Sequence, residues 1–111
     1  MAAKFELKAA KGGKFMFVLK AANGKVVLTS ETYDAKKTAV KGIDAVKKNA
    51  ASDKRFEKKA AKNGQQYFIL KAANGEPIGR SETYTSAKSV NNGIASVMKS
   101  APEARVDDLT A

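Results

Sequence analysis

The first residues of the chain alternate between apolar and charged side chains. Phe5 and Leu7 alternate with charged neighbours, which is the period of a strand with one buried face. The apolar stretches that follow predict a second strand over about 14–21 and a third over about 25–30. A stripe of small and apolar residues then predicts a helix over about 35–48. One unit is therefore strand, strand, strand, helix.

Local signals support these boundaries. Asn23-Gly24 separates the second and third strands, and this pair favours a type I′ hairpin turn. Asp34 stands where a helix N-cap is expected, and Thr85 holds the same place before a second helix over about 86–99. Gly42 lies in the middle of the first predicted helix, where glycine is unfavourable, so we expect the helix to pack closely on the sheet there.

The whole unit occurs twice, with a constant offset of 51 residues, so that roughly half of the paired positions are identical. We place the first repeat at about 4–50 and the second at about 55–101. Arg105-Val106-Asp107 resembles the start of each repeat and predicts a last strand at about 104–109. A single pseudo-twofold domain, covering residues 1–111, is the simplest arrangement. The segments shared by the two repeats are Leu-Lys-Ala-Ala-Asn-Gly, Ser-Glu-Thr-Tyr and Gly-Ile-x-x-Val.

The second strand of each repeat is apolar on both faces. Phe17, Leu19, Phe68 and Leu70 are assigned to the face covered by the helices. Two helices of this length cover only one side of such a sheet, so the other face needs a different cover: the other lobe, a second chain or a ligand. That face predicts a protein-interaction or self-association surface. It consists of Met16, Val18, Tyr67 and Ile69.

Charge adds a second hypothesis. The formal net charge is +10, and the first half carries most of it. An excess of this kind either keeps the protein soluble or binds an acidic partner such as nucleic acid. The alternative function is therefore weak, salt-dependent nucleic-acid binding. The basic residues that flank the two hairpins would make the contacts: Lys14, Lys20, Lys25, Lys71 and Arg80.

The chain has few of the residue types that catalysis commonly uses. The chain has neither cysteine nor histidine, which removes thiol and disulfide chemistry, the usual proton shuttle and the commonest metal ligand. Glu6 with Glu31, and Glu57 with Glu82, are weak candidates for paired carboxylates. We predict no enzyme activity, no catalytic residues, no cofactor and no metal. Without an apolar leader or membrane segment, the chain is expected to be cytosolic.

Taken together, the repeated motifs resemble the bacterial YegP-like family of small uncharacterised proteins. The resemblance covers nearly the whole chain, from about Phe5 to Leu109. It implies tandem strand-strand-strand-helix-strand units in one sheet, with exchanged terminal strands, and it brings no established activity. The repeats differ where Leu28 becomes Gly79 and Val26 becomes Pro77, so the third strands are not equivalent.

The sequence thus predicts an α+β domain: a tandem repeat of βββαβ units forming one mainly antiparallel sheet, with two helices on one face. Its predicted function is a noncatalytic cytosolic binding module of unknown partner, with nucleic-acid binding as the alternative. No membrane partner is expected.

Overall fold

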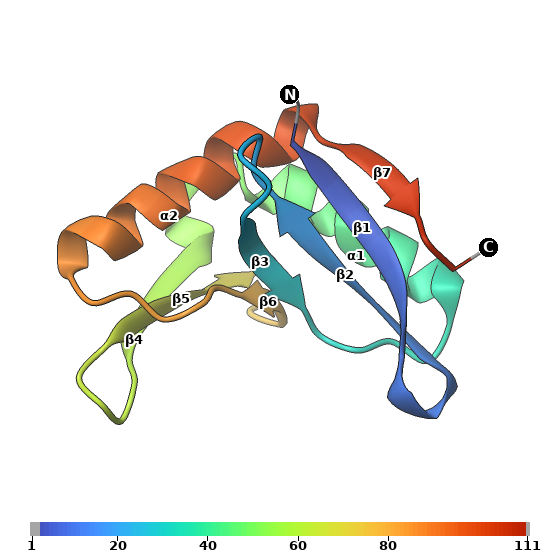
Figure 1. Cartoon of the computed structure of the whole chain (residues 1–111), viewed down its shortest axis with the longest axis horizontal. Coiled ribbons are helices and arrows are strands. Elements are labelled where there is room, and N and C mark those ends of the chain that lie inside the picture. Colours follow the sequence, from blue (N-terminus) through green and yellow to red (C-terminus); the bar gives the residue numbers. More distant parts are fainter. Residues whose placement is uncertain (1–2, 111) are drawn as a thin grey trace.

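The first repeat folds as the alternation predicts. The computed structural model describes residues 3–110 (Figure 1). The elements of the first repeat are β1 (Lys4–Ala10), β2 (Lys14–Lys20), β3 (Val26–Ser30) and α1 (Lys36–Asn49). Those of the second are β4 (Phe56–Ala60), β5 (Gln66–Lys71), β6 (Pro77–Arg80), α2 (Ala87–Ser100) and the closing strand β7 (Arg105–Asp108). Short 3-10 segments lie at Lys11–Gly13, Asp53–Arg55 and Ala101–Glu103.

All the strands join one sheet, in the order β4-β5-β6-β3-β2-β1-β7. The two repeats meet in the middle, where β3 and β6 run antiparallel. β7 follows the second helix but pairs in parallel with β1, the first strand of the other repeat. The predicted exchange of terminal strands is therefore confirmed, and β1–β7 is the one parallel pair among the described strands.

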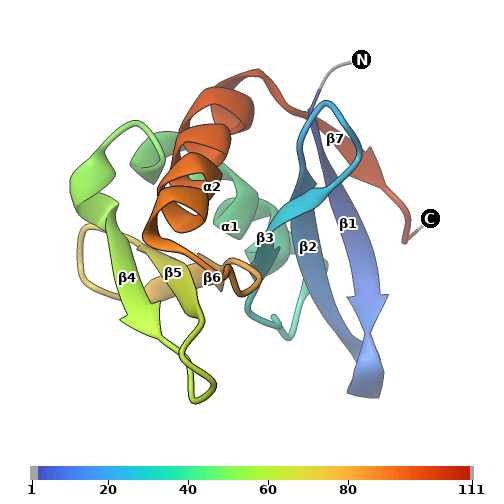
Figure 2. The same ribbon diagram turned by 60° about the vertical axis from the view of Figure 1, so that its left-hand side comes forward.

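Both helices lie on the same side of a strongly twisted sheet (Figures 1 and 2). One cluster of buried residues extends through both repeats and includes Phe5, Phe17 and Phe68, each fully buried. α1 contacts β5 and β6 of the second repeat as well as its own strands, and α2 contacts β3 of the first. Side-chain packing across the middle therefore joins the halves more extensively than the short β3–β6 pairing alone.

The Ser-Glu-Thr-Tyr motif has a structural explanation. The buried hydroxyl of Ser30 accepts a hydrogen bond from the Phe17 amide at 2.8 Å and donates one to the Glu31 carbonyl at 2.7 Å. Ser81 makes the same two bonds in the second repeat. The serine thus satisfies the backbone where the third strand leaves the sheet, because a buried unpaired amide is costly.

The tyrosine of the same motif explains the glycine in each helix. Tyr33 stacks on Phe17, with ring centroids 6.2 Å apart. A Cβ at Gly42 would lie only 2.6 Å from the Tyr33 hydroxyl oxygen and 2.9 Å from Phe17 Cε2. Gly93 meets Tyr84 in the same way, at 2.5 Å. The expected close packing of helix on sheet is confirmed, and it is centred on the tyrosine.

Two local predictions were wrong. The N-caps are Ala35, without a side-chain hydrogen bond, and Ser86, whose side chain accepts from the Ser89 amide. Both helices start one residue later than predicted, and Asp34 instead pairs with Lys14. The hairpin turn is not type I′, because positive φ angles occur only at glycine. A hydrogen bond from the Gly24 amide to the Ala21 carbonyl marks a type I turn, with Gly24 supplying the following left-handed residue.

The repeats differ most where they meet. Leu28 of β3 is fully buried, and a Cβ at Gly79 of β6 would lie 3.2 Å from its Cγ and 2.8 Å from the Thr29 carbonyl oxygen. A large residue in one repeat therefore faces a glycine in the other, which confirms that the third strands are not equivalent. Pro77 begins β6, as its missing amide donor favours. Across the described residues, no helix has the length and apolar character needed to cross a membrane.

Candidate functional site: the open face of the sheet

The face opposite the helices carries one row of side chains across all seven strands. Strand pairing places these residues side by side, and they alternate with the core residues along each strand. We call this side the open face. Its central row is Asp107, Glu6, Val18, Thr29, Arg80, Ile69 and Glu57. Acidic residues therefore stand near both ends, with Arg80 near the middle, between Thr29 and Ile69.

Glu6 is the centre of a buried ionic cluster near one end of the row. The residue is only 7% exposed, and its carboxylate oxygens lie 3.1 Å from Lys20 Nζ, 3.4 Å from Lys4 Nζ and 3.5 Å from Lys8 Nζ. The hydrogen bond from Lys20, with help from Lys4, lowers the pKa of the Glu6 carboxyl against the opposing effect of burial. Lys4 also reaches Asp107 at 3.3 Å, which ties β7 to the cluster.

The second repeat contains a weaker version of this cluster. Glu57 lies 2.7 Å from Lys71 and 3.8 Å from Lys59 but is exposed to solvent. The hydrogen bond from Lys71 lowers the pKa of Glu57. Both glutamates thus pair with lysines. Within residues 3–110, no three acidic side chains are close enough to hold a metal ion.

The four residues predicted as an interaction face lie on this open face but differ in exposure. Met16, Tyr67 and Ile69 are half-buried, whereas Val18 is only 5% exposed. Val18 has Glu6 and Thr29 as its cross-strand neighbours, and Lys4 and Lys8 of the ionic cluster stand on either side of Glu6 along β1. Because lysine stems cover apolar surface while their ammonium groups stay in water, no further layer is needed over Val18. Val18 therefore belongs to the interior and offers no surface to a partner.

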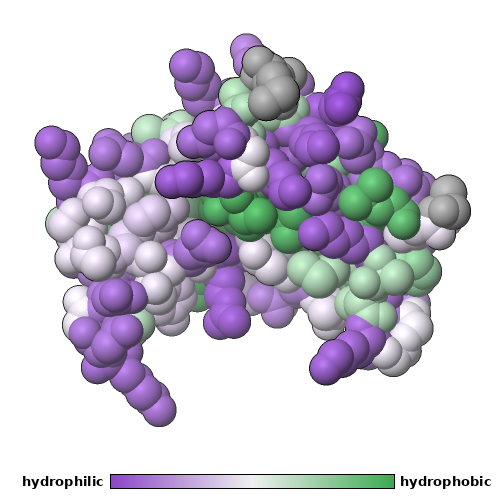
Figure 3. Space-filling model, viewed as in Figure 1, coloured by the Kyte–Doolittle hydropathy of each residue, from purple (hydrophilic) through white to green (hydrophobic). Residues whose placement is uncertain are grey.

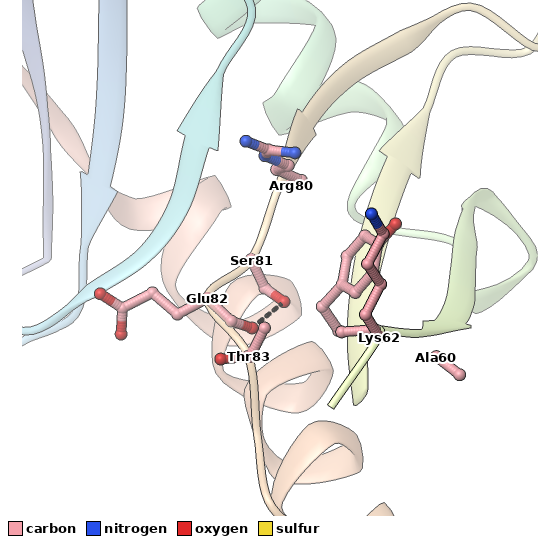
Figure 4. Close-up of a pocket in the computed structure, with 8 residues that line it drawn as sticks. Ala60, Lys62, Arg80, Ser81, Glu82 and Thr83 are labelled. Atoms are coloured by element: carbon pink, nitrogen blue, oxygen red, sulfur yellow. Dashed lines mark hydrogen bonds between the residues drawn. The ribbon is translucent and has the colours of Figure 1, made fainter. Parts of the chain in front are cut away.

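A hollow of about 430 Å³ lies on the open face of the second repeat. Tyr67 and Arg80 line it, together with Lys62 from the β4–β5 turn and the chain that leaves β6. Figure 4 shows Arg80, Ser81, Glu82 and Thr83 following one another along one side, with Lys62 and Ala60 on the other. No ion pair in the described structure includes Arg80, which is exposed.

The five basic residues of the nucleic-acid hypothesis are not brought together. Lys20 and Lys71 are engaged by Glu6 and Glu57. Lys14 pairs with Asp34 at 3.0 Å. Lys14 and Lys20 stand at opposite ends of β2, six residues apart, which is about 20 Å along a strand. Lys25 lies in the β2–β3 turn. Of the five, only Arg80 is exposed on the open face without an ion pair in the described structure.

Sequence reasoning missed the contributions of Lys4, Lys8 and Lys62. The alternation Lys4-Glu6-Lys8 places all three side chains of that triplet on one face, which is a signal that could have been used. Their convergence with Lys20 required the β1–β2 register, in which Lys4 is opposite Lys20. Lys62 lines the hollow through the path of a turn, which residue type alone does not indicate.

The fold and the repeated ionic clusters define a class of protein: a fused tandem of two βββα units that completes one sheet by exchanging its last strand. A family model described as a domain of unknown function (DUF1508) matches residues 10–57 and again residues 61–108. The chain therefore belongs to this family and carries two copies of the domain.

Named relatives agree with this assignment. A UPF0339 protein of Pseudomonas aeruginosa is 50% identical over 108 residues, covering 97% of this chain and 98% of the relative. The UPF0339 protein YegP of Escherichia coli K12 is 48% identical over 110 residues, covering 99% of this chain and 100% of the relative. The expected resemblance to YegP-like proteins is confirmed, and these relatives are described without an activity.

Solved structures show the same fold. The solution NMR structure of YegP from E. coli, a protein of unknown function, superposes with a TM-score of 0.92 at 48% identity, covering 98% of this chain and 94% of that one. The solution NMR structure of a UPF0339 protein of Shewanella oneidensis gives a TM-score of 0.91 at 44% identity, covering 98% and 92% of the two chains. The α+β fold of one mainly antiparallel sheet and two helices is thus shared.

Proposed function

We propose that this protein is a noncatalytic binding module that recognises a protein partner through the middle of its open face. The contact surface would be a central patch of four residues, Met16, Tyr67, Ile69 and Arg80. The observation that carries the proposal is the position of Arg80. It is exposed beside the hollow and belongs to none of the ion pairs of the described structure.

The chemistry of the central patch supports a protein partner. Arginine, tyrosine and methionine are enriched in protein interfaces, and arginine and tyrosine are frequent among the residues that dominate binding energy. Ile69 pairs directly with Arg80 across the sheet, so an apolar contact lies beside a free guanidinium. A partner that presents a carboxylate next to an apolar side chain would match both.

The surroundings of the central patch favour protein over nucleic acid. Hydrophilic side chains cover most of the molecule in the view of Figure 3, with small hydrophobic areas near the middle and toward the right. Lys20 and Lys71, which would have to contact phosphates, are engaged by glutamates of this same chain. Nucleic-acid binding on a sheet also relies on several stacking aromatics, and Tyr67 is the aromatic residue of the central patch.

Affinity capture from lysate tests the proposal. The baits are the wild-type protein, Arg80→Glu in the patch, and Lys37→Glu, the same charge change at an exposed position of α1. We expect a protein captured by wild type and Lys37→Glu to fall at least tenfold with Arg80→Glu, with or without nuclease. Reversing an acidic residue of that partner should restore binding to Arg80→Glu.

Other outcomes would contradict the proposal in distinct ways. Equal capture by all three baits would show that the central patch is not the binding surface. Capture that disappears after nuclease treatment would favour nucleic acid. Sedimentation velocity at several concentrations tests self-association, and an Arg80-dependent dimer would identify the partner as a second copy.

A further inference from the structure

The two outer edges of the sheet are not alike. β1 is covered on its outer side by β7, whereas β4, its counterpart in the second repeat, ends the sheet. Within residues 3–110, no strand pairs with the outer edge of β4. An uncovered edge presents unpaired backbone amides and carbonyls, which are a template for another strand. The chain itself shows what such a strand looks like, because β7 occupies the equivalent position.

β7 binds β1 through its backbone and two acidic residues. The register places Val106 opposite Phe5, Asp107 opposite Glu6 and Asp108 opposite Leu7. Asp107 pairs with Lys4 on the open face, and Asp108 pairs with Lys36 of α1. The Leu109 amide donates a hydrogen bond to the Leu7 carbonyl at 2.8 Å. An apolar residue followed by two acidic ones is thus the pattern that this edge accepts.

A hollow of about 260 Å³ marks the equivalent position beside β4, between that strand and α2. Its lining consists of Asp53, Phe56, Lys58, Asn91 and Ile94. With the offset of 51 residues, Phe56 and Lys58 correspond to Phe5 and Leu7, the two residues that Val106 and Asp108 face. The second repeat therefore keeps the groove but not the strand that fills it.

Charge indicates what this groove accepts. Lys58 replaces Leu7, so the residue opposite Lys58 would take the place that Asp108 has on β1. Arg55 replaces Lys4, the residue that pairs with Asp107. Lys58 and Lys59 of β4 are charges of the kind that keep an exposed edge from pairing with an identical copy. An acidic strand is therefore favoured over a second copy of this edge.

We propose that the outer edge of β4 binds an extended, acidic segment of another protein, added in parallel to the sheet. The segment carries an apolar residue opposite Phe56, followed by two acidic residues opposite Glu57 and Lys58, as Val106-Asp107-Asp108 do on β1. Main-chain hydrogen bonds supply affinity in this mode, and alternate side chains supply specificity. This site is separate from the central patch and does not depend on it.

A peptide with the chain's own β7 sequence provides the probe. Fluorescein-labelled Glu-Ala-Arg-Val-Asp-Asp-Leu-Thr is titrated with the full-length protein, and anisotropy reports binding. We expect saturable binding that Lys58→Glu weakens at least tenfold and Lys37→Glu leaves unchanged. A peptide with proline in place of leucine, whose amide donates to the neighbouring strand in the chain's own β7, should not bind, because proline lacks an amide donor. A peptide with asparagine for both aspartates should bind at least fivefold more weakly.

Amide chemical shifts locate the site, because the peptide also has the sequence that covers β1. The proposal requires perturbation of Phe56–Ala60 and of α2 near Asn91. Perturbation confined to Lys4–Ala10 would show displacement of β7 and would overturn it. Absence of binding at millimolar peptide, or equal binding by Lys58→Glu, would also overturn it. None of these results bears on capture through Arg80, so the two proposals fail separately.

Discussion

The two halves of this molecule share a core and differ at their outer edges. Glu6 and Glu57 occupy equivalent positions, yet Glu6 is 7% exposed among three lysines, whereas Glu57 is exposed and pairs with two. β7 pairs with the strand that carries Glu6, and its Asp107 shares Lys4 with that glutamate. No described strand pairs with the outer side of β4, which carries Glu57. One added strand therefore accompanies the difference between a buried ionic cluster and a solvated one.

The middle of the sheet teaches the opposite lesson. There the two repeats touch each other, and their sequences diverge so that Leu28 faces Gly79. Leu28 and Gly79 are equivalent residues that flank the pseudo-twofold axis, where Thr29 pairs with Arg80, and a large residue at both positions would collide in the space that the structure allows. Fusion into one chain lets the repeats become complementary at the seam while the cores remain equivalent.

The largest expected effect is at this seam. Leu28→Ala removes a fully buried side chain and leaves a cavity, so we expect it to lower the free energy of unfolding by about 2–5 kcal/mol. Urea denaturation measures the change. Gly79→Ala, which forces a Cβ to 2.8 Å from a backbone carbonyl, should cost about 1–3 kcal/mol. If neither variant is destabilised by 1 kcal/mol, the repeats do not pack as described.

The next effect tests whether the cores are equivalent. Alanine in a helix normally exceeds glycine in stability by about 1 kcal/mol. Gly42→Ala and Gly93→Ala should instead both destabilise, by about 1–3 kcal/mol, because the new methyl group meets a tyrosine. Thermal unfolding of the two variants provides the comparison. A stabilised variant would contradict the tyrosine contact in that half, and effects of very different size would show that the cores are not equivalent.

The two ionic clusters should differ in how much they contribute to stability and to its pH dependence. Because the pKa of Glu6 is lowered, its carboxylate stabilises the fold above its ordinary pKa of 4.5, and this stabilisation is lost as the pH falls through the lowered value. We expect Glu6→Gln to destabilise by about 1 kcal/mol at pH 7 and to flatten the pH dependence of stability below pH 4.5. Glu57→Gln, the matched control, should change neither measurably at 0.15 M salt. Equal effects would refute the difference in burial.

The smallest effect concerns the β7 side chain that reaches α1. The hydrogen bond from Lys36, followed by those from Thr110, lowers the pKa of Asp108 from 3.8 to about 2. Its stabilising effect is present above pH 3.8 and is lost as the pH falls toward 2. In Lys36→Ala, NMR titration should show the Asp108 pKa moving back toward 3.8. An unchanged pKa would mean that Lys36 does not hold β7.

The sequence allowed most of the fold to be predicted, because the offset repeat fixed the same strands and helix twice. Local geometry was predicted less well: Asn23 accepts a hydrogen bond from the Lys25 amide rather than adopting a positive φ angle, and Asp34 pairs with Lys14 rather than capping α1. Both residue types suit several roles, and neighbouring side chains decide among them.

The candidate sites depended on information that residue patterns do not contain. The alternation placed Val18 on the open face correctly, but its burial follows from the register that sets Glu6 and the lysines around it. The exposure of Arg80 beside the hollow likewise depends on which strand pairs with which. The free edge of β4 followed only from the strand order, since its sequence closely resembles that of β1.

The position of β7 also determines what happens when the chain is cleaved between the two repeats. A cut in the segment around 50–54, between α1 and β4, would separate β7 from β1, with which it pairs, and α1 from β5 and β6, which it contacts. The strand that ends the second fragment belongs beside the strand that begins the first. Neither fragment contains the complete sheet. Reassembly of the two fragments, each fused to a different protein, would therefore report that the two fused proteins lie close together.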